Sequence, residues 1–349
     1  MRYIKLGRTG LDVSPIAIGA MTYGEPGVGH PAWSLDEEAS RPLIKHALEA
    51  GVNFFDTANL YSYGTSEAIL GRALKDFAVR DDVVITTKLR HPMRPGSPNS
   101  AGLSRKAIMT ELDHSLRRLG TDYVDVYMIH RFDGATPLEE TLEALHDVVK
   151  AGKVRYLGAS SMHAWQFAKA LHLQERHGWA RFATMQNHYN LVAREEEREM
   201  LPLCADEGVA TMVWSPLARG RLARPFDQAN AGERAASDGG YADMLYKANA
   251  DSDRLIIDAV GAIAEDRGLS RAQVALAWLR RNPVVAAPLV GARTIGQIDD
   301  AVASLDLDLT DDEARRLEAP YTPRHDFQGI SDERELERIR AGIPGYANH

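Results

Sequence analysis

Short apolar runs alternate along the chain with longer segments in which apolar residues recur every three or four positions. The runs have the length of buried strands, as the Phe54-Phe55 pair illustrates. The longer segments have the spacing of amphipathic helices, as in Ile108, Leu112 and Leu116. Strands are expected near residues 15–19, 53–56, 83–88, 123–130, 154–160, 182–186, 209–215 and 284–291.

Eight strands that are each followed by a helical segment predict a parallel sheet closed into an α/β fold, the (β/α)8 TIM barrel. Two short apolar segments around a glycine-rich turn predict an N-terminal β-hairpin at residues 1–14. We therefore expect a single domain, with the barrel over about residues 15–319 and a C-terminal tail, 320–349, over the barrel mouth. The tail and a Gly-, Ala- and Asp-rich insertion at 218–251 are either lids and binding segments or variable surface.

Charge and composition narrow the class of protein. The 349 residues carry a net charge of −8, and no basic patch stands out that could bind nucleic acid. No apolar run is long enough for a membrane span, and the first residues lack the apolar core of a signal peptide. The one cysteine, Cys204, lies on a predicted apolar helix face, which favours a core residue over a reactive thiol. These features predict a cytoplasmic protein with no nucleic-acid or membrane partner.

Three consecutive predicted strands end in side chains that can take part in acid–base chemistry. These are Asp56, Lys88 and His130, and Tyr61 follows in the loop after the first strand. Because the carboxyl ends of barrel strands meet at one rim, we expect the four side chains to lie together. A nearby ammonium would lower the pKa of the phenol, which is about 10 when unperturbed. With an imidazole to orient a carbonyl oxygen, such a set could protonate that oxygen as charge develops there.

Each of the four residues also has a structural interpretation. Asp56 could cap a helix, and Lys88 could be a solvated strand end. His130 could be a core histidine, and Tyr61 could pack at the rim. Taken singly, each structural interpretation is favoured, but the placement of all four at one rim favours a catalytic role.

Two longer motifs contain these residues and resemble signatures of the aldo-keto reductase superfamily. Asp56-Thr-Ala-x-x-Tyr61-x-x-Gly64-x-x-Glu67-x-x-x-Gly71 is similar to the first signature, and residues 109–130 are similar to the second. The resemblance extends from residue 6 to about residue 319. Residues 158–164, 185–191, 194–200 and 214–222 are most similar to the bacterial YajO subgroup, described as 1-deoxyxylulose-5-phosphate synthase-like.

The resemblance implies an NADPH-dependent reductase of small aldehydes, ketones or sugar-phosphate-like substrates. Tyr61 would be the general acid, with its pKa lowered by Lys88 and Asp56, and His130 would position the carbonyl. Hydride would come from a nicotinamide lying across the barrel mouth.

The chain has no glycine-rich dinucleotide fingerprint, because Gly27-Val28-Gly29 lacks the third glycine and a preceding strand. The resemblance implies instead that barrel loops hold NADPH (NADP+), with NADH as the alternative. Ser160 and Gln186 would hydrogen-bond the carboxamide, and Trp214 would stack on the ring unless it is a plain core residue. The implied cofactor-binding residues are Ser160, Ser161, Gln186, Trp214, Ser215, Leu217, Arg219, Gly220, Gly291, Arg293, Gln297 and Asp300.

Two of these positions depart from the pattern of many family members. Ser161 stands where many have asparagine, and Asp300-Ala301 stands where many have a Glu-Asn pair. The guanidinium of Arg293 suits a 2′-phosphate, which favours NADPH, but the adenine contacts and the strength of that preference stay open.

The substrate pocket is expected in the loops above the strand ends and in the tail. Arg131, next to His130, would suit a phosphate or carboxylate on the substrate, or is a solvated rim charge. The expected pocket residues are Met21, Tyr23, Trp33, Tyr63, His91, Arg131 and Phe132.

Three other functions compete with this hypothesis. A metal-dependent barrel enzyme would need a ligand cluster, and the twelve histidines show no His-x-His or Glu-x-x-His arrangement. A non-catalytic, redox-sensing nicotinamide-binding subunit would bind cofactor without turnover. A thiamine-linked activity, suggested by the subgroup description, has no motif here.

Overall fold

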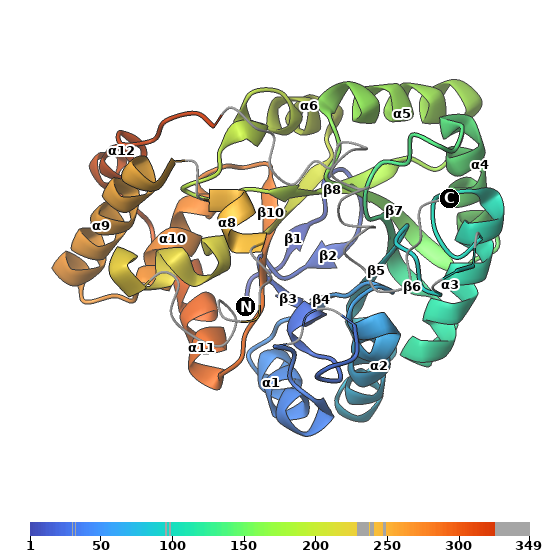
Figure 1. Cartoon of the computed structure of the whole chain (residues 1–349), viewed down its shortest axis with the longest axis horizontal. Coiled ribbons are helices and arrows are strands. Elements are labelled where there is room, and N and C mark those ends of the chain that lie inside the picture. Colours follow the sequence, from blue (N-terminus) through green and yellow to red (C-terminus); the bar gives the residue numbers. More distant parts are fainter. Residues whose placement is uncertain are drawn as a thin grey trace.

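The computed structural model describes residues 1–29, 31, 33–94, 96–97, 99–228, 237, 241–246 and 249–324. Its centre is a closed barrel of parallel strands in the order β10-β3-β4-β5-β6-β7-β8-β9, with helices around it (Figure 1). This confirms the predicted α/β barrel. The strands are β3 (Ala17–Gly19), β4 (Phe54–Asp56), β5 (Val84–Leu89), β6 (Val124–Ile129), β7 (Val154–Ser160), β8 (Phe182–His188), β9 (Ala210–Trp214) and β10 (Val285–Val290).

The predicted N-terminal hairpin is present and consists of β1 (Ile4–Lys5) and β2 (Asp12–Val13), paired antiparallel. It closes the amino end of the barrel. Leu6 and Val13 are fully buried there in one cluster with barrel residues such as Phe54, and the amide of Arg8 donates to the Gly208 carbonyl at 3.0 Å.

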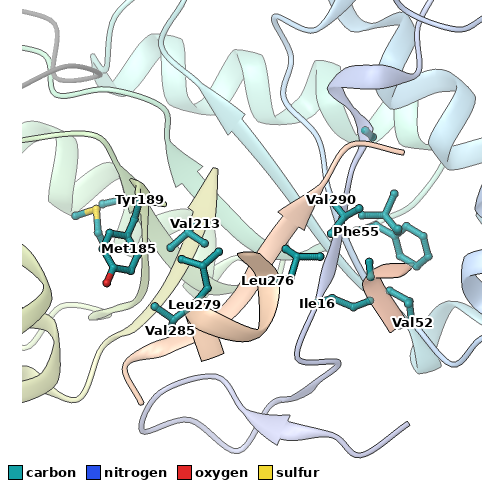
Figure 2. Packing of buried hydrophobic residues seen from close by; sticks show 14 of the residues in the cluster. Ile16, Val52, Phe55, Met185, Tyr189, Val213, Leu276, Leu279, Val285 and Val290 are labelled. Carbon is teal, nitrogen blue, oxygen red and sulfur yellow. The ribbon is translucent and has the colours of Figure 1, made fainter. Parts of the chain in front are cut away.

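The helices pack against the outside of the barrel through apolar faces. In α10, for example, Leu276 and Leu279 are buried beside Val285 and Val290 of β10 (Figure 2). The strands are buried on both faces, which explains why they read as continuous apolar runs. The helices are α1 (Glu37–Glu49), α2 (Thr65–Phe77), α3 (Arg105–Leu119), α4 (Leu138–Lys150), α5 (Ala164–His177), α6 (Met200–Glu207), α8 (Tyr241–Tyr246), α9 (Ala250–Arg267), α10 (Arg271–Arg280), α11 (Ile295–Ala303) and α12 (Asp311–Glu318).

The described part of the 218–251 insertion includes both exposed and buried residues. Residues 218–223 form a short 3-10 helix, and α8 buries Leu245 and Tyr246 completely or nearly so. The α8 segment is therefore part of the packed structure. Of the expected tail, residues 320–324 are described, and its proposed position over the mouth falls on residues 325–349, which lie outside the described residues.

Cys204 lies on α6 and is fully buried, as its apolar helix face predicts.

Candidate active site

The ends of β4, β5 and β6 bring the predicted acid–base residues together. These strands are direct neighbours in the barrel, with Asp56 paired to Thr86 and Lys88 paired to Met128. His130 follows β6, and its amide donates to the Leu89 carbonyl at 2.9 Å. The three strand-end side chains therefore face one rim, as the barrel geometry requires.

The ammonium of Lys88 is fully buried and is surrounded by oxygens. Its Nζ lies 2.6 Å from Asp56 Oδ2, 2.9 Å from the Thr57 carbonyl oxygen and 3.3 Å from the Tyr61 hydroxyl. The other oxygen of Asp56 accepts a hydrogen bond of 2.9 Å from the Gln186 amide. An ammonium has three protons to donate, so these oxygens satisfy it completely.

The structure gives Gln186 a partner that the sequence analysis did not identify. The resemblance assigns its amide to a carboxamide, whereas here the Nε2 donates to Asp56 and lies 3.7 Å from the sulfur of Met128. Gln186 thus fixes the orientation of the aspartate that pairs with Lys88.

Burial and charge act in opposite directions on these groups. Burial favours the neutral amine, but Asp56 and Tyr61 hold the pKa of Lys88 above its ordinary value. Burial raises the pKa of Tyr61, Lys88 opposes this, and the charge of Asp56 adds to it. Lys88 therefore lowers the pKa of Tyr61 as predicted, whereas Asp56 raises it, contrary to the prediction. Because burial is the largest effect, the net shift of the pKa is upward.

His130 lies between two other rings. Its ring centroid is 5.7 Å from that of Tyr61 and 4.9 Å from that of His91, both edge to face. Burial is the largest cause that lowers its pKa well below 6.5, and the charge of His91 adds to it. Its buried Nδ1 has no hydrogen-bond partner among the residues that the structure describes. The imidazole is therefore neutral at physiological pH.

The loop that carries Tyr61 is held in an unusual backbone conformation. Ser62, Tyr63 and Gly64 have φ of 46°, 47° and 90° in succession. The amides of Thr57 and Asn59 attach the start of the loop to β5, at 2.8 Å from the Thr86 oxygen and 3.1 Å from the Lys88 oxygen. The loop is thus fixed on the strand that supplies the lysine.

The side chains of residues 66 and 67 contact other parts of the barrel and do not cap α2. The helix begins after Gly64 with no side-chain cap, because these side chains bind elsewhere. Ser66 donates to the Ala20 carbonyl at 2.7 Å. The fully buried Glu67 accepts from Thr87 and from Arg118, each at 2.6 Å.

Apart from Gln186 on β8, the residues expected to bind the nicotinamide lie at the ends of β7 and β9. The Trp214 indole nitrogen donates to the Ser161 hydroxyl at 3.1 Å, and this hydroxyl lies 3.1 Å from that of Ser160. One face of the indole stacks on the imidazole of His188, with centroids 4.1 Å apart and planes 10° apart.

Sequence reasoning did not single out His188. Strand alternation could have done so, because residues two apart on a strand face the same side and Gln186 was already a candidate.

The residues expected to bind the pyrophosphate form a tight turn after β9. Ser215, Ala218, Arg219 and Gly220 all have positive φ, between 47° and 94°, and the amides of Ala218 and Gly220 donate within the loop, to the carbonyls of Ser215 and Leu217. The half-buried Leu217 lies within this turn, and Arg221 and Arg224 follow it. Their guanidinium groups, with that of Arg219, carry the positive charge that the phosphates of a dinucleotide need.

The loop after β10 supplies the remaining expected cofactor residues. The Arg293 guanidinium donates to the Trp33 carbonyl at 3.1 Å, and the Arg293 amide donates to Gln297 Oε1 at 2.7 Å. Gly291 and Gln297 are exposed, and Asp300 is half-buried on α11. Arg293 is thus held over the residue 33 segment rather than extended into solvent.

The expected pocket residues divide into two groups. Met21, Tyr63, His91, Arg131 and Phe132 are half-buried, as pocket walls are, and the Arg131 guanidinium lies 5.8 Å from the Trp214 ring centroid. Trp33 is largely buried. Tyr23 has no exposed surface and belongs to the hydrophobic core, so it does not line an open pocket.

The described ranges contain neither a membrane-spanning helix nor a metal-binding cluster. None of the helices there is both long enough and apolar enough to cross a membrane. The same residues contain no grouping of three or more His, Cys, Asp and Glu side chains that could hold a metal ion.

Comparison with known proteins identifies the family. Residues 15–321 match the aldo/keto reductase family. The chain is 45% identical to versiconal hemiacetal acetate reductase of Aspergillus parasiticus, over 93% of this chain and 98% of that protein. It is 44% identical to an aldo-keto reductase of Alternaria alternata, over 91% of each chain, and 36% identical to a putative aryl-alcohol dehydrogenase of Saccharomyces cerevisiae, over 93% and 98%. The chain therefore belongs to the aldo/keto reductase family and is an oxidoreductase that acts on carbonyl groups.

Proposed function

We propose that this protein reduces the carbonyl group of small aldehydes, ketones or sugar-phosphate-like compounds with NADPH, and that Tyr61 is the general acid. The observation that carries the proposal is the position of Lys88 Nζ, 2.6 Å from Asp56 and 3.3 Å from the Tyr61 hydroxyl. A half-buried phenol beside an ion-paired ammonium can release a proton to an adjacent oxygen and be stabilised as the phenolate afterwards.

The four residues act on the substrate oxygen. The raised pKa of Tyr61 keeps its proton in place until negative charge develops on the carbonyl oxygen, which then takes that proton. Lys88 stabilises the phenolate that remains, and Asp56 keeps Lys88 charged. His130, neutral because its pKa is lowered, offers a ring nitrogen to orient the carbonyl. When bound, NADPH supplies the hydride that reaches the carbonyl carbon.

The cofactor is assigned to the barrel loops. Ser160, Ser161, Gln186 and Trp214 would hold the nicotinamide, and the Gln186 Nε2 also donates to Asp56. The positive-φ turn with Ser215, Leu217, Arg219 and Gly220 would bind the pyrophosphate. Arg293 would bind the 2′-phosphate, which favours NADPH over NADH. Gly291, Gln297 and Asp300 complete the adenosine side of the site.

The substrate class is inferred from the relatives and from the pocket. The relatives include a versiconal hemiacetal acetate reductase and a putative aryl-alcohol dehydrogenase, which supports aromatic carbonyl compounds among the substrates. Phe132 and His91 would contact an aromatic ring, and Arg131 would contact an anionic group.

We also propose that the protein belongs to the YajO subgroup, although the relatives compared above are fungal proteins. We further propose that it is located in the cytoplasm, where a buried free thiol such as that of Cys204 stays reduced.

The test compares wild type with Tyr61→Phe. Binding of NADPH and NADH is measured by fluorescence titration, and reduction of small aromatic aldehydes and phosphorylated sugars is measured at saturating cofactor. We expect an unchanged Kd for NADPH and a fall in kcat of about 100-fold or more, the factor assigned to a lost proton donor.

Tyr3→Phe is the matched control, because Tyr3 loses a phenol hydroxyl that bonds to the Gly51 carbonyl at the hairpin, away from the barrel mouth. Undiminished reduction by Tyr61→Phe would remove Tyr61 from the proposed role. Tight cofactor binding without turnover of any aldehyde by wild type would favour the redox-sensing alternative.

A further inference from the structure

The stack between Trp214 and His188 is built into the barrel wall. The two residues are directly opposite each other on the neighbouring strands β8 and β9. Their ring centroids are 4.1 Å apart and their planes differ by 10°. His188 is 5% exposed, so its imidazole forms a buried support under one face of the indole.

A buried hydrogen-bond network fixes the imidazole in turn. His188 Nε2 lies 2.8 Å from the hydroxyl of Tyr246, and the Asn190 amide donates to the same hydroxyl at 3.3 Å. Asn190 also donates to the Ser215 carbonyl at 2.9 Å, in the residue after Trp214. Rotation of the imidazole would leave a buried polar group without its partner, which is costly.

Tyr246 is held by segments that lie far away in the sequence. It ends α8, and the Arg324 guanidinium lies 5.7 Å from its ring centroid. Arg324 also donates to the Leu245 carbonyl at 3.4 Å and to both oxygens of Asp253 on α9. A continuous set of contacts therefore connects residue 324 to the face of Trp214.

We infer that His188 is a positioning residue that sets the plane of Trp214 for the cofactor, and that Tyr246 holds His188 in that orientation. This inference rests on the proposed function, which assigns Trp214 to the nicotinamide. An indole that is already fixed loses little rotational freedom when a planar ring stacks on its other face. The fixed indole therefore strengthens cofactor binding, which lowers the Kd for NADPH. The network described above does not include the acid–base residues Tyr61, Lys88 and Asp56, so the chemical step should be spared.

The test uses volume-conserving variants. His188→Leu fills the space but removes the ring stack, His188→Phe restores a ring, and Tyr246→Phe removes only the hydroxyl. We expect His188→Leu to raise the Kd for NADPH about 3- to 10-fold, the range set by the worth of one aromatic pair. We expect His188→Phe to recover most of that loss and Tyr246→Phe to raise Kd about threefold. The rate constant of a single turnover at saturating NADPH should stay within about twofold of wild type in all three.

The chain provides a matched control in a second stack of the same kind. His177 stacks on Trp179 after α5, with centroids 4.4 Å and planes 15° apart, and neither residue belongs to the proposed site. His177→Leu should leave the Kd for NADPH unchanged.

The outcomes separate the inference from the proposed function. A weakened Kd in Trp214→Ala together with a wild-type Kd in His188→Leu would overturn the inference and leave the proposed function intact. A wild-type Kd in Trp214→Ala would overturn the assignment of Trp214, and the inference with it. Should His188→Leu fail to fold, an unchanged Kd in Tyr246→Phe would overturn the inference.

Discussion

At the scale of single residues, the buried ammonium of Lys88 determines the chemistry of the site. The ammonium of a lysine is a compact charge with three hydrogen-bond donors. Asp56, the Thr57 carbonyl and the Tyr61 hydroxyl each accept one of these hydrogen bonds. Arginine could not replace it. Its planar guanidinium group binds a carboxylate through two parallel hydrogen bonds and would not place one charge between three separate oxygens. The phenol therefore sits beside a cation whose pKa is raised and which stays charged.

The pKa shifts predict a flat pH profile for reduction. Burial lowers the pKa of His130 well below 6.5, so the imidazole does not become charged when the pH falls to about 6. Burial raises the pKa of Tyr61 above 10.0, so the phenol keeps its proton when the pH rises to about 9. We expect kcat/KM to show no inflection between about pH 6 and 9 when measured at saturating cofactor.

His130→Asn is the control for the acid side of this profile, because it removes the titrating group. An acid-side inflection near pH 6.5 that disappears in this variant would mean that His130 titrates at its ordinary pKa and contradict the assignment.

At the scale of elements, the connection between β4 and α2 fixes the position of the acid. Its left-handed run ends at Gly64, which has φ of 90°, and a Cβ there would lie 2.5 Å from Cδ and Nε of Arg118. The same Nε donates to Glu67. The glycine and the glutamate of the motif thus hold α2 against α3.

Gly64→Ala should destabilise the protein by about 1–3 kcal/mol, because it introduces both left-handed strain and a clash with Arg118. The free energy of unfolding is measured by chemical denaturation. Gly296→Ala on α11 is the matched control: nothing lies within 4 Å of its Cβ position, and it should stabilise the protein by about 0.5–1 kcal/mol. Equal effects in the two variants would refute this account of the loop.

The sequence predicts much of this architecture because strand and helix patterns are local. The barrel strands, the hairpin and the convergence of Asp56, Lys88 and His130 at one rim all follow from apolar runs and their order. The partners of side chains across the barrel cannot be predicted from these local patterns. The hydrogen bond from Gln186 to Asp56 spans 130 residues, and the contacts of residues 65–67 depend on which strand and helix lie opposite. Burial of Tyr23 and the net pKa of Tyr61 likewise depend on three-dimensional packing.

At the scale of the whole molecule, the segment after α12 connects the C-terminal part of the chain to the barrel. Arg324 is 2% exposed, donates to both oxygens of Asp253 and to the Val192 carbonyl, and its amide donates to Glu195. Tyr321 donates to the same glutamate. The segment therefore joins α9 to the residues that follow β8.

Arg324→Ala should lower the free energy of unfolding by about 3–5 kcal/mol, because it leaves the buried carboxylate of Asp253 without its partner. Chemical denaturation measures the loss. Arg316→Ala, which removes an exposed pair with Asp266 at 3.8 Å, should change stability by less than about 0.5 kcal/mol. A loss in Arg324→Ala no larger than that of Arg316→Ala would show that this segment does not stabilise the barrel.

The most direct test of the central claim follows a hydride to the product. Wild type is given NADPH with both hydrogens at C4 of the nicotinamide replaced by deuterium, together with an aromatic aldehyde, and the alcohol is analysed by mass spectrometry. The account predicts one deuterium on the former carbonyl carbon, at a rate that falls by about 100-fold in Tyr61→Phe. An alcohol without deuterium, or transfer at an equal rate in Tyr61→Phe, would contradict it.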